Sequence, residues 1–139
     1  MKKTNHYVSD GIIDTTKIAF DFAKLLKKNC IIYLNGEVGS GKTLFTSKVA
    51  SYFGVHTITS SSFSRVQAHL GIPNIVHCDL YRGNCSTSQL ELESHLVEPW
   101  LLFIEWPTEI LSIPNSFQYT VNIAIIDQNV RNFSIEQIN

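Results

Sequence analysis

The sequence contains no long apolar run of the kind that crosses a membrane. Nowhere in the chain do about 18 apolar residues follow one another, the length that a membrane-spanning helix needs. Lys2 and Lys3 stand near the start, but no apolar stretch follows them as it would in a secretory signal. We therefore expect a cytoplasmic protein that neither spans a membrane nor is secreted.

The sequence also lacks an excess of either charge. Its 11 Lys and Arg residues face 12 Asp and Glu residues, which gives a net charge of -1. A chain this close to neutral has no overall electrostatic attraction to nucleic acid or to an anionic membrane. Any link to RNA is therefore expected to be local or to run through a partner.

Cysteines are few, and their spacing matches no metal or redox motif. Cys30, Cys78 and Cys85 are odd in number and form no C-x-x-C pair, which favours reduced, buried thiols in the cytoplasm. The alternative is a zinc site built from His77, Cys78, Cys85 and His95, but those spacings correspond to no known ligand pattern.

The composition is that of one globular domain. Apolar residues make up 44% of the chain and charged residues 17%, and 139 residues suffice to bury a core. No repeat, linker or low-complexity segment divides the sequence, so residues 1–139 are interpreted as a single domain.

One motif points directly to chemistry. Residues 36–43 match G-x-x-x-x-G-K-S/T at every position and stand between an apolar run, 30–34, and a helix-like segment, 44–53. The motif residues, all expected to bind nucleotide, are Gly36, Glu37, Val38, Gly39, Ser40, Gly41, Lys42 and Thr43. This is the pattern and setting of a phosphate-binding P-loop; the alternative is a glycine-rich turn that only caps a helix.

Each residue type in this motif has a physical purpose. Glycines let successive backbone N–H groups turn toward an anion, and the following helix adds the positive end of its dipole. Lys42 is expected to reach the β- and γ-phosphates of ATP, and the hydroxyl of Thr43 to ligate Mg²⁺.

Hydrophobic periodicity predicts an α/β fold. Apolar residues at helical spacing predict a helix over 15–28, capped by Asp14 or Thr15, and a P-loop helix that stops at Gly54. The other expected elements are strands at 30–34, 56–59 and 100–104, a hairpin of 65–70 with 74–78, a short helix from the capping box Ser88-x-x-Glu91, and a C-terminal hairpin around 127–129. We therefore predict a three-layer, P-loop NTPase-like fold with a mainly parallel central sheet and added antiparallel strands.

Two acids stand where a second part of a nucleotide site is expected. Glu105 directly follows the apolar run 101–104, the arrangement of a Walker B element, and Asp79 follows the weaker run 75–78. We interpret Glu105 as a catalytic metal ligand, and Asp79 as a ligand or as a group that orients water. The plainer alternative for each is a loop residue at the end of a strand.

Four ordered motifs together resemble a known family. They are Leu-Asn-Gly through Lys-Thr at 34–43, Ser-Ser-Ser-Phe at 60–63, His-Cys-Asp-Leu-Tyr-Arg at 77–82 and Ile-Glu-Trp-Pro at 104–107. In order and spacing they resemble the signatures of the TsaE (YjeE) family. Its members are small bacterial P-loop ATPases needed for the threonylcarbamoyl modification of adenosine beside the anticodon of tRNAs that read codons starting with A.

The resemblance implies roles for particular residues. Thr43 and Glu105 would hold Mg²⁺, Asp79 would serve turnover, and Ser62 would be a switch-like residue near the γ-phosphate. Ser61 replaces the proline of the family's motif and removes a rigid turn residue beside Ser62.

Two further nucleotide contacts are implied by the same resemblance. A family threonine close to the base corresponds to Thr15 or Thr16. Arg131 resembles a family residue close to the nucleotide, although a solvated surface arginine is the alternative.

We therefore predict an ATPase that is weak alone. The resemblance implies that it acts with TsaD and TsaB proteins and touches tRNA only indirectly. The alternatives are a small metabolite kinase and a nucleotide-dependent binding module without useful turnover. A kinase would need an arginine-rich lid, whereas Arg65, Arg82 and Arg131 are scattered along the chain.

Overall fold

The computed structural model describes residues 3–59, 66–80 and 88–139. The motif positions Ser60, Ser61, Ser62, Phe63, Tyr81 and Arg82, together with Arg65 and Cys85, lie outside these residues. The elements are β1 (Lys3–Asp10), α1 (Ile12–Leu25), β2 (Cys30–Asn35), α2 (Lys42–Tyr52), β3 (Val66–His69), β4 (Asn74–Asp79), α3 (Gln89–Glu93), β5 (Trp100–Glu105), β6 (Phe117–Ile125) and β7 (Val130–Gln137).

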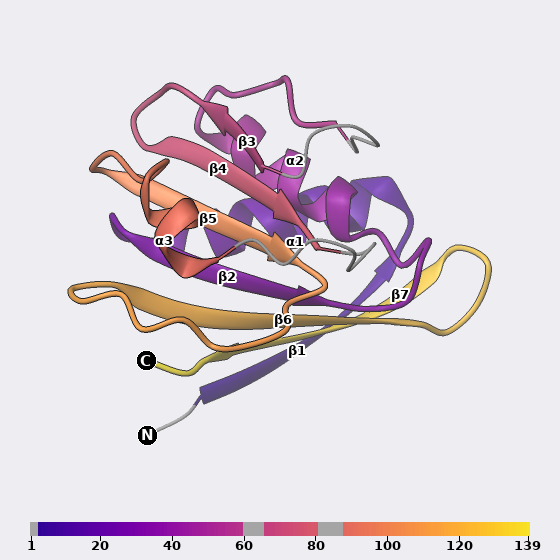
Figure 1. The fold of residues 1–139 in the computed structure, drawn as a ribbon. Helices are drawn as coiled ribbons and strands as arrows, with labels where there is room; N and C mark the ends of the chain where they lie inside the picture. The colour runs from indigo at the N-terminus through magenta and orange to yellow at the C-terminus, as the bar shows by residue number, and fades with distance from the viewer. Residues whose placement is uncertain (1–2, 60–65, 81–87) are drawn as a thin grey trace.

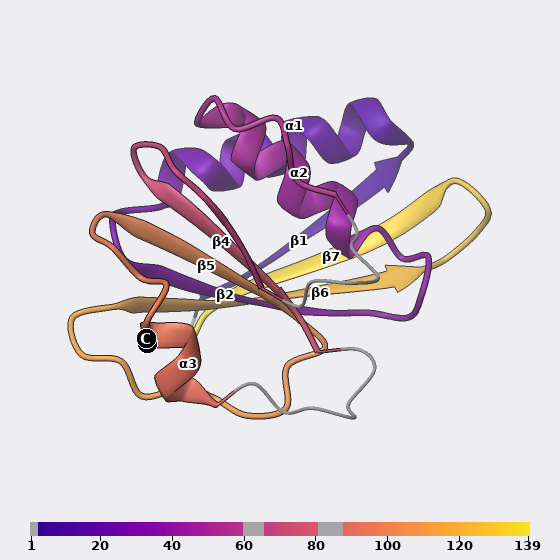
Figure 2. The same cartoon turned by 45° about the horizontal axis from the view of Figure 1, so that its top comes forward.

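The strands form one seven-stranded sheet in the order β1-β7-β6-β2-β5-β4-β3 (Figure 1). The central strands β6, β2, β5 and β4 pair in parallel, while β1, β7 and β3 are joined to the margins antiparallel. Helices α1 and α2 cover one face of the sheet, and the short α3 lies on the other (Figure 2). The predicted α/β fold with antiparallel strands at its margins is confirmed.

Strands β2 and β5 are buried on both faces, as their unbroken apolar sequences predict. Alternate residues of β2 enter different cores, because successive side chains of a strand point to opposite faces. Ile32 and Leu34 pack beneath α1 and α2, whereas Ile31 and Tyr33 pack on the side of α3. Burial on both sides explains why β2 shows no alternation of polar and apolar residues.

The C-terminal hairpin follows its predicted period of two. Tyr119, Val121 and Ile123 of β6 are buried toward α1 and α2, and Phe133 of β7 joins them from the partner strand. The opposite face of β6 carries polar residues such as Thr120 and Asn122. The β3–β4 hairpin is confirmed too, with Val66–His69 paired to the strand that starts at Asn74.

The predictions for the N-terminal region need correction. The N-terminal residues form β1, which was not predicted, and α1 begins at Ile12 rather than at 15 and ends at Leu25 rather than at 28. Neither predicted cap is used: the N-cap is Gly11, and Thr15 lies in the helix, where its hydroxyl meets Ser9 of β1. Tertiary pairing of β1 with β7 thus decides where the helix starts.

Residues 56–59 do not form the predicted strand. Buried Ile58 anchors the segment in the core, and side chains tie it to β3 in place of a backbone ladder. The Thr57 hydroxyl lies 2.8 Å from Nδ1 of His69, and Gln67 donates to the carbonyl of Thr59 at 3.4 Å. The predicted capping box holds in part, since Ser88 Oγ accepts from the backbone N–H of Glu91 at the start of α3.

A buried polar cluster fixes the chain that follows β5. The hydroxyl of Tyr33 accepts from the backbone N–H of Leu111 at 2.8 Å and donates to Oε1 of Gln118 at 3.1 Å. Nε2 of Gln118 in turn donates to the backbone carbonyl of Leu111 at 2.9 Å. Burial raises the pKa of the Tyr33 phenol, which therefore stays protonated as a donor.

Within the described residues, no helix is both long and apolar enough to cross a membrane.

Tyr33→Phe is expected to lower the free energy of unfolding by about 1–3 kcal/mol, because it leaves the N–H of Leu111 and the oxygen of Gln118 buried without their shared partner. Urea denaturation followed by circular dichroism measures this loss. Tyr52→Phe is the matched control, because Tyr52 is 41% exposed and its change is expected to stay within about 0.5 kcal/mol. Equal effects of the two variants would contradict the assignment.

Candidate functional site

The P-loop lies between the carboxyl end of β2 and the start of α2. Gly41 is the N-cap of α2 and has a φ of 107°, in the left-handed region that favours glycine. A Cβ at Gly36 would lie 2.7 Å from the backbone carbonyl oxygen of Ile123 and 2.5 Å from Oγ of Ser40. Both glycines are therefore required by the path of the backbone.

A cleft of about 400 Å³ opens beside this loop. It is lined by Val38, Gly39, Gly41, Lys42, Thr43, Leu44, Asp79, Glu105 and Trp106. The two acids predicted from the sequence thus lie with the P-loop lysine and threonine in one cleft.

Strand register explains how the two acids meet. In the parallel pairing of β4 with β5, Asp79 is opposite Glu105, and Leu34 of β2 is opposite Glu105 from the other side. The backbone N–H of Leu80 also donates to the carbonyl of Glu105 at 3.1 Å. Because the strands run in parallel, their carboxyl ends reach the same edge of the sheet, where open α/β sheets place ligands.

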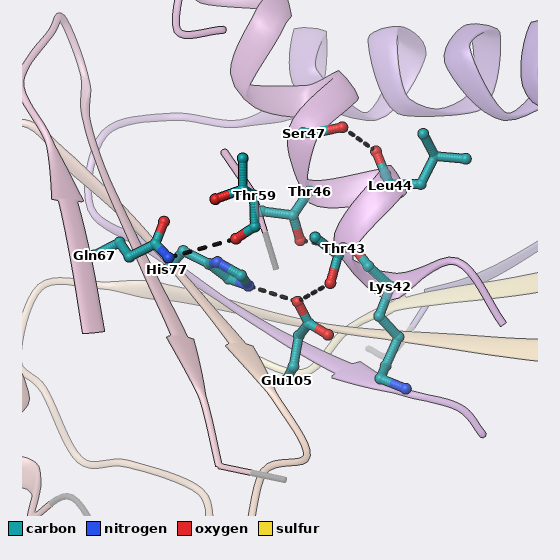
Figure 3. A network of polar contacts seen from close by, with 9 residues as sticks. All are labelled: Lys42, Thr43, Leu44, Thr46, Ser47, Thr59, Gln67, His77 and Glu105. Atoms are coloured by element: carbon teal, nitrogen blue, oxygen red, sulfur yellow. Dashed lines mark hydrogen bonds and ion pairs between the residues drawn. The ribbon is translucent and has the colours of Figure 1, made fainter. Parts of the chain in front are cut away.

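Glu105 is held by two side chains (Figure 3). Its Oε2 accepts from the hydroxyl of Thr43 at 2.7 Å and lies 2.5 Å from Nε2 of His77. The side chains of His77 and Glu105 are 3% and 5% exposed, so this contact is shielded from water.

Lys42 folds back onto its own loop. Its Nζ donates to the carbonyls of Gly36 at 2.6 Å and Glu37 at 3.1 Å, and lies 4.0 Å from the centre of the Trp106 ring. Burial lowers the pKa of Lys42, and the carboxylates of Glu105 and Asp79 partly offset that effect. The ammonium is thus placed at the loop where phosphate is expected to bind.

The cleft has the ligands that suit Mg²⁺. This ion prefers oxygen donors and is commonly bound through one or two carboxylates together with substrate phosphates. The Thr43 hydroxyl and the Glu105 carboxylate are in contact at 2.7 Å, and Asp79 lines the same cleft. The oxygen donors therefore fit the ion that the P-loop motif predicts. Among the described residues no group of three or more His, Cys, Asp and Glu side chains is placed to hold a metal ion, so the proposed site would depend on Thr43 and the phosphates as well.

A second cavity, of about 180 Å³, borders the P-loop from the side of α1. Thr15 lines it, whereas the hydroxyl of Thr16 donates to the carbonyl of Ile12 within the helix. Ser9 Oγ has one proton and donates it to Gly11, so in its 2.7 Å contact with Thr15 the threonine is the donor. The oxygen of Thr15 thereby keeps its acceptor capacity for a ligand.

Arg131 lines this cavity as well, but its guanidinium nitrogens donate hydrogen bonds to backbone carbonyls. It donates to Ser40 and Gly39 of the P-loop, both at 3.2 Å, and to Asp127 and Gln128 in the β6–β7 turn at 2.8 and 3.2 Å. The arginine therefore joins the P-loop to the C-terminal hairpin, a contact that the sequence did not predict.

His77 is the residue that the sequence analysis missed as a partner of Glu105. A signal was present, because His77 and Asp79 are two positions apart on β4 and so share one face of the strand. Only the register of β4 against β5 brings that face onto Glu105. Ser62, expected near the γ-phosphate, is outside the described residues.

Comparison with known proteins agrees with this geometry. The family model for the threonylcarbamoyl adenosine biosynthesis protein TsaE matches residues 10–133. This chain belongs to the TsaE family. It is 35% identical over 131 residues to the tRNA threonylcarbamoyladenosine biosynthesis protein TsaE of Rickettsia typhi, covering 91% of this chain and 90% of that protein. The TsaE of Aquifex aeolicus is 29% identical, with 88% of each chain covered.

A solved structure confirms the fold of this TsaE family member. The crystal structure of Bacillus subtilis YdiB matches with a TM-score of 0.74 and 21% identity, covering 100% of this chain and 88% of that one. At this identity the likeness establishes the arrangement of the sheet and helices.

Nucleotide binding is expected to change the fluorescence of Trp106, because Lys42 must leave its ring to meet phosphate. Titration of the protein with ATP and Mg²⁺ measures the change. Trp106→Phe should abolish it, whereas Trp100→Phe should keep it, since Trp100 lies at the far end of β5. A full signal from Trp106→Phe would contradict this arrangement.

Proposed function

We propose that this chain is a Mg²⁺-dependent ATPase of tRNA threonylcarbamoyladenosine biosynthesis. The observation that carries the proposal is the 2.7 Å contact between Thr43 of the P-loop and the buried carboxylate of Glu105. This pair joins the two halves of a nucleotide site, the phosphate loop and the acid at the end of a neighbouring strand. Membership of the TsaE family supports the pathway.

Different groups of the cleft would contact different parts of the phosphate chain. The backbone N–H groups of the loop and the N-terminus of α2 would face the phosphate oxygens. Lys42, now bonded to the carbonyls of Gly36 and Glu37, would turn to the β- and γ-phosphates. Mg²⁺, held by Thr43 and Glu105, would neutralise charge that develops on the phosphates.

Asp79 would act on the attacking water or complete the shell of the metal. It stands opposite Glu105 in the β4–β5 pairing and lines the same cleft. A carboxylate placed beside the γ-phosphate can orient a water molecule for in-line attack. Glu105, already engaged by Thr43 and His77, is the acid better placed to hold the metal.

The second cavity would take the base of the nucleotide. It shares Gly39 and Gly41 of the P-loop with the cleft. The hydroxyl oxygen of Thr15, which lines it, could accept a hydrogen bond from a ligand there. An adenine amino group is a donor of the matching kind. Arg131 would act through the P-loop carbonyls that it holds.

TsaD and TsaB proteins are the proposed partners, in the cytoplasm. With a net charge of -1 the chain has no overall attraction to RNA, so contact with tRNA would run through those partners. The ATPase would set the state of the modifying complex, and TsaD would carry the transfer chemistry.

Substitution of the two acids separates their roles. Glu105→Gln should lower turnover by about 10²-fold or more, because it removes a metal ligand worth several kcal/mol. Asp79→Asn should keep Mg²⁺-dependent ATP binding and lose turnover by roughly 10²–10⁴-fold. Calorimetry and phosphate release measure binding and turnover, with Lys42→Ala as the variant expected to lose binding. Normal hydrolysis by Glu105→Gln would reverse the two assignments.

The isolated protein is expected to be a slow ATPase that its partners stimulate. An arginine on the γ-phosphate is worth roughly 10³–10⁵ in rate, and Lys42 is the cation whose position the P-loop motif specifies. Phosphate release should be measured alone and with TsaD and TsaB proteins, for wild type and Arg82→Ala. Fast turnover by the isolated wild type would contradict this expectation.

A further inference from the structure

His77 is a buried histidine whose role the P-loop motif does not explain. It is 3% exposed and comes from the middle of β4, two residues before Asp79. Its Nε2 lies 2.5 Å from Oε2 of Glu105. A histidine buried at such a place needs a partner, and here the partner is the proposed metal ligand.

The contact restricts the carboxylate of Glu105. Oε2 accepts from Thr43 on one side and meets His77 on the other, so two elements, α2 and β4, fix one oxygen. The other oxygen lies on the Lys42 side of the carboxylate (Figure 3). A glutamate has three rotatable side-chain bonds, and two short contacts to one oxygen remove most of that freedom.

The chemistry of the pair defines which atom donates. An ionised carboxylate is an acceptor only, so against it Nε2 of His77 is the donor. The Thr43 hydroxyl can give its oxygen to the metal and still donate its proton to Glu105, so it would itself belong to the metal site. His77 is then the contact that holds Glu105 from outside that site.

We propose that His77 is a positioning residue that holds Glu105 in its metal-binding orientation and thereby sets the affinity of the nucleotide site for Mg²⁺. The inference rests on the proposed function, in which Glu105 ligates the metal. Hydrogen-bond partners of metal ligands typically contribute 10–100-fold in metal affinity. The proposed effect is of this kind and is confined to the metal-dependent part of nucleotide binding.

The test measures the metal-dependent part directly. Calorimetry gives the Kd of a non-hydrolysable ATP analogue in EDTA and in excess Mg²⁺. The Kd in EDTA divided by the Kd in Mg²⁺ reports the contribution of the metal. His77→Met puts an apolar side chain of similar size in place of the ring and removes the donor. Its ratio should therefore move toward one by about 10–100-fold. Its Kd in EDTA should stay within about twofold, because the contacts to phosphate remain.

His77→Gln is the rescue variant, since its amide can donate from nearly the position of Nε2. Its ratio should stay within about threefold of wild type. His69→Gln is the matched control: His69 is on the neighbouring strand β3 and pairs with Thr57. Its ratio should be that of wild type.

Two outcomes would overturn the inference. One is a wild-type ratio in His77→Met. The other is an equal loss in His77→Met and His77→Gln, which would show that the donor is not the cause. Glu105→Gln, run beside them, keeps this test separate from the proposed function. If it leaves the ratio unchanged, Glu105 is not a metal ligand; if it lowers the ratio while His77→Met does not, only the role of His77 fails.

A measurement on the wild type covers the case in which His77→Met does not fold. Nitrogen-15 NMR of the histidine rings reports which nitrogen carries the proton. Nε2 of His77 should be protonated both without ligand and with Mg²⁺ and the analogue bound. An unprotonated Nε2 in the bound protein would overturn the proposal.

Discussion

The parallel pairing of β2, β5 and β4 is the constraint on which the site depends. It sets Leu34, Glu105 and Asp79 side by side at one edge of the sheet, directly where the P-loop leaves β2. Both faces of these strands are buried, so a shift of register by one residue would turn Glu105 into the opposite core. The hydrophobic cores therefore do more than stabilise the domain, because they fix where the acids point.

Burial of Glu105 has a physical cost that its partners offset. An ionised carboxylate removed from water is tolerated only when hydrogen bonds replace its hydration. Thr43 and His77 supply those bonds, and the ammonium of Lys42 lies close enough to interact electrostatically with the carboxylate. The same contacts would also hold the carboxylate in place for the proposed metal, so stability and the proposed function rest on one set of interactions.

Much of the fold could be predicted because local signals agreed with tertiary demands. The P-loop, the buried runs of β2 and β5 and the alternating hairpin of β6 and β7 each carry a strong period or motif. The failures lie where local signals were weak. β1 has no long apolar run, and 56–59 resembles a strand but is held by side chains to β3. Pairing with a distant strand, β7, decides the first case.

The sequence by itself determined which residues are candidates for the chemistry, since residues 36–43 match a phosphate-binding loop and the acids at 79 and 105 follow apolar runs. It did not determine which side chains meet, because the order and register of the strands depend on contacts between distant segments. Only the tertiary structure placed His77 on Glu105, 28 residues apart in sequence, and Arg131 on the P-loop, 91 residues from Ser40. The physical reason is that a period of two tells which face a side chain takes, whereas packing of the whole sheet decides what lies opposite.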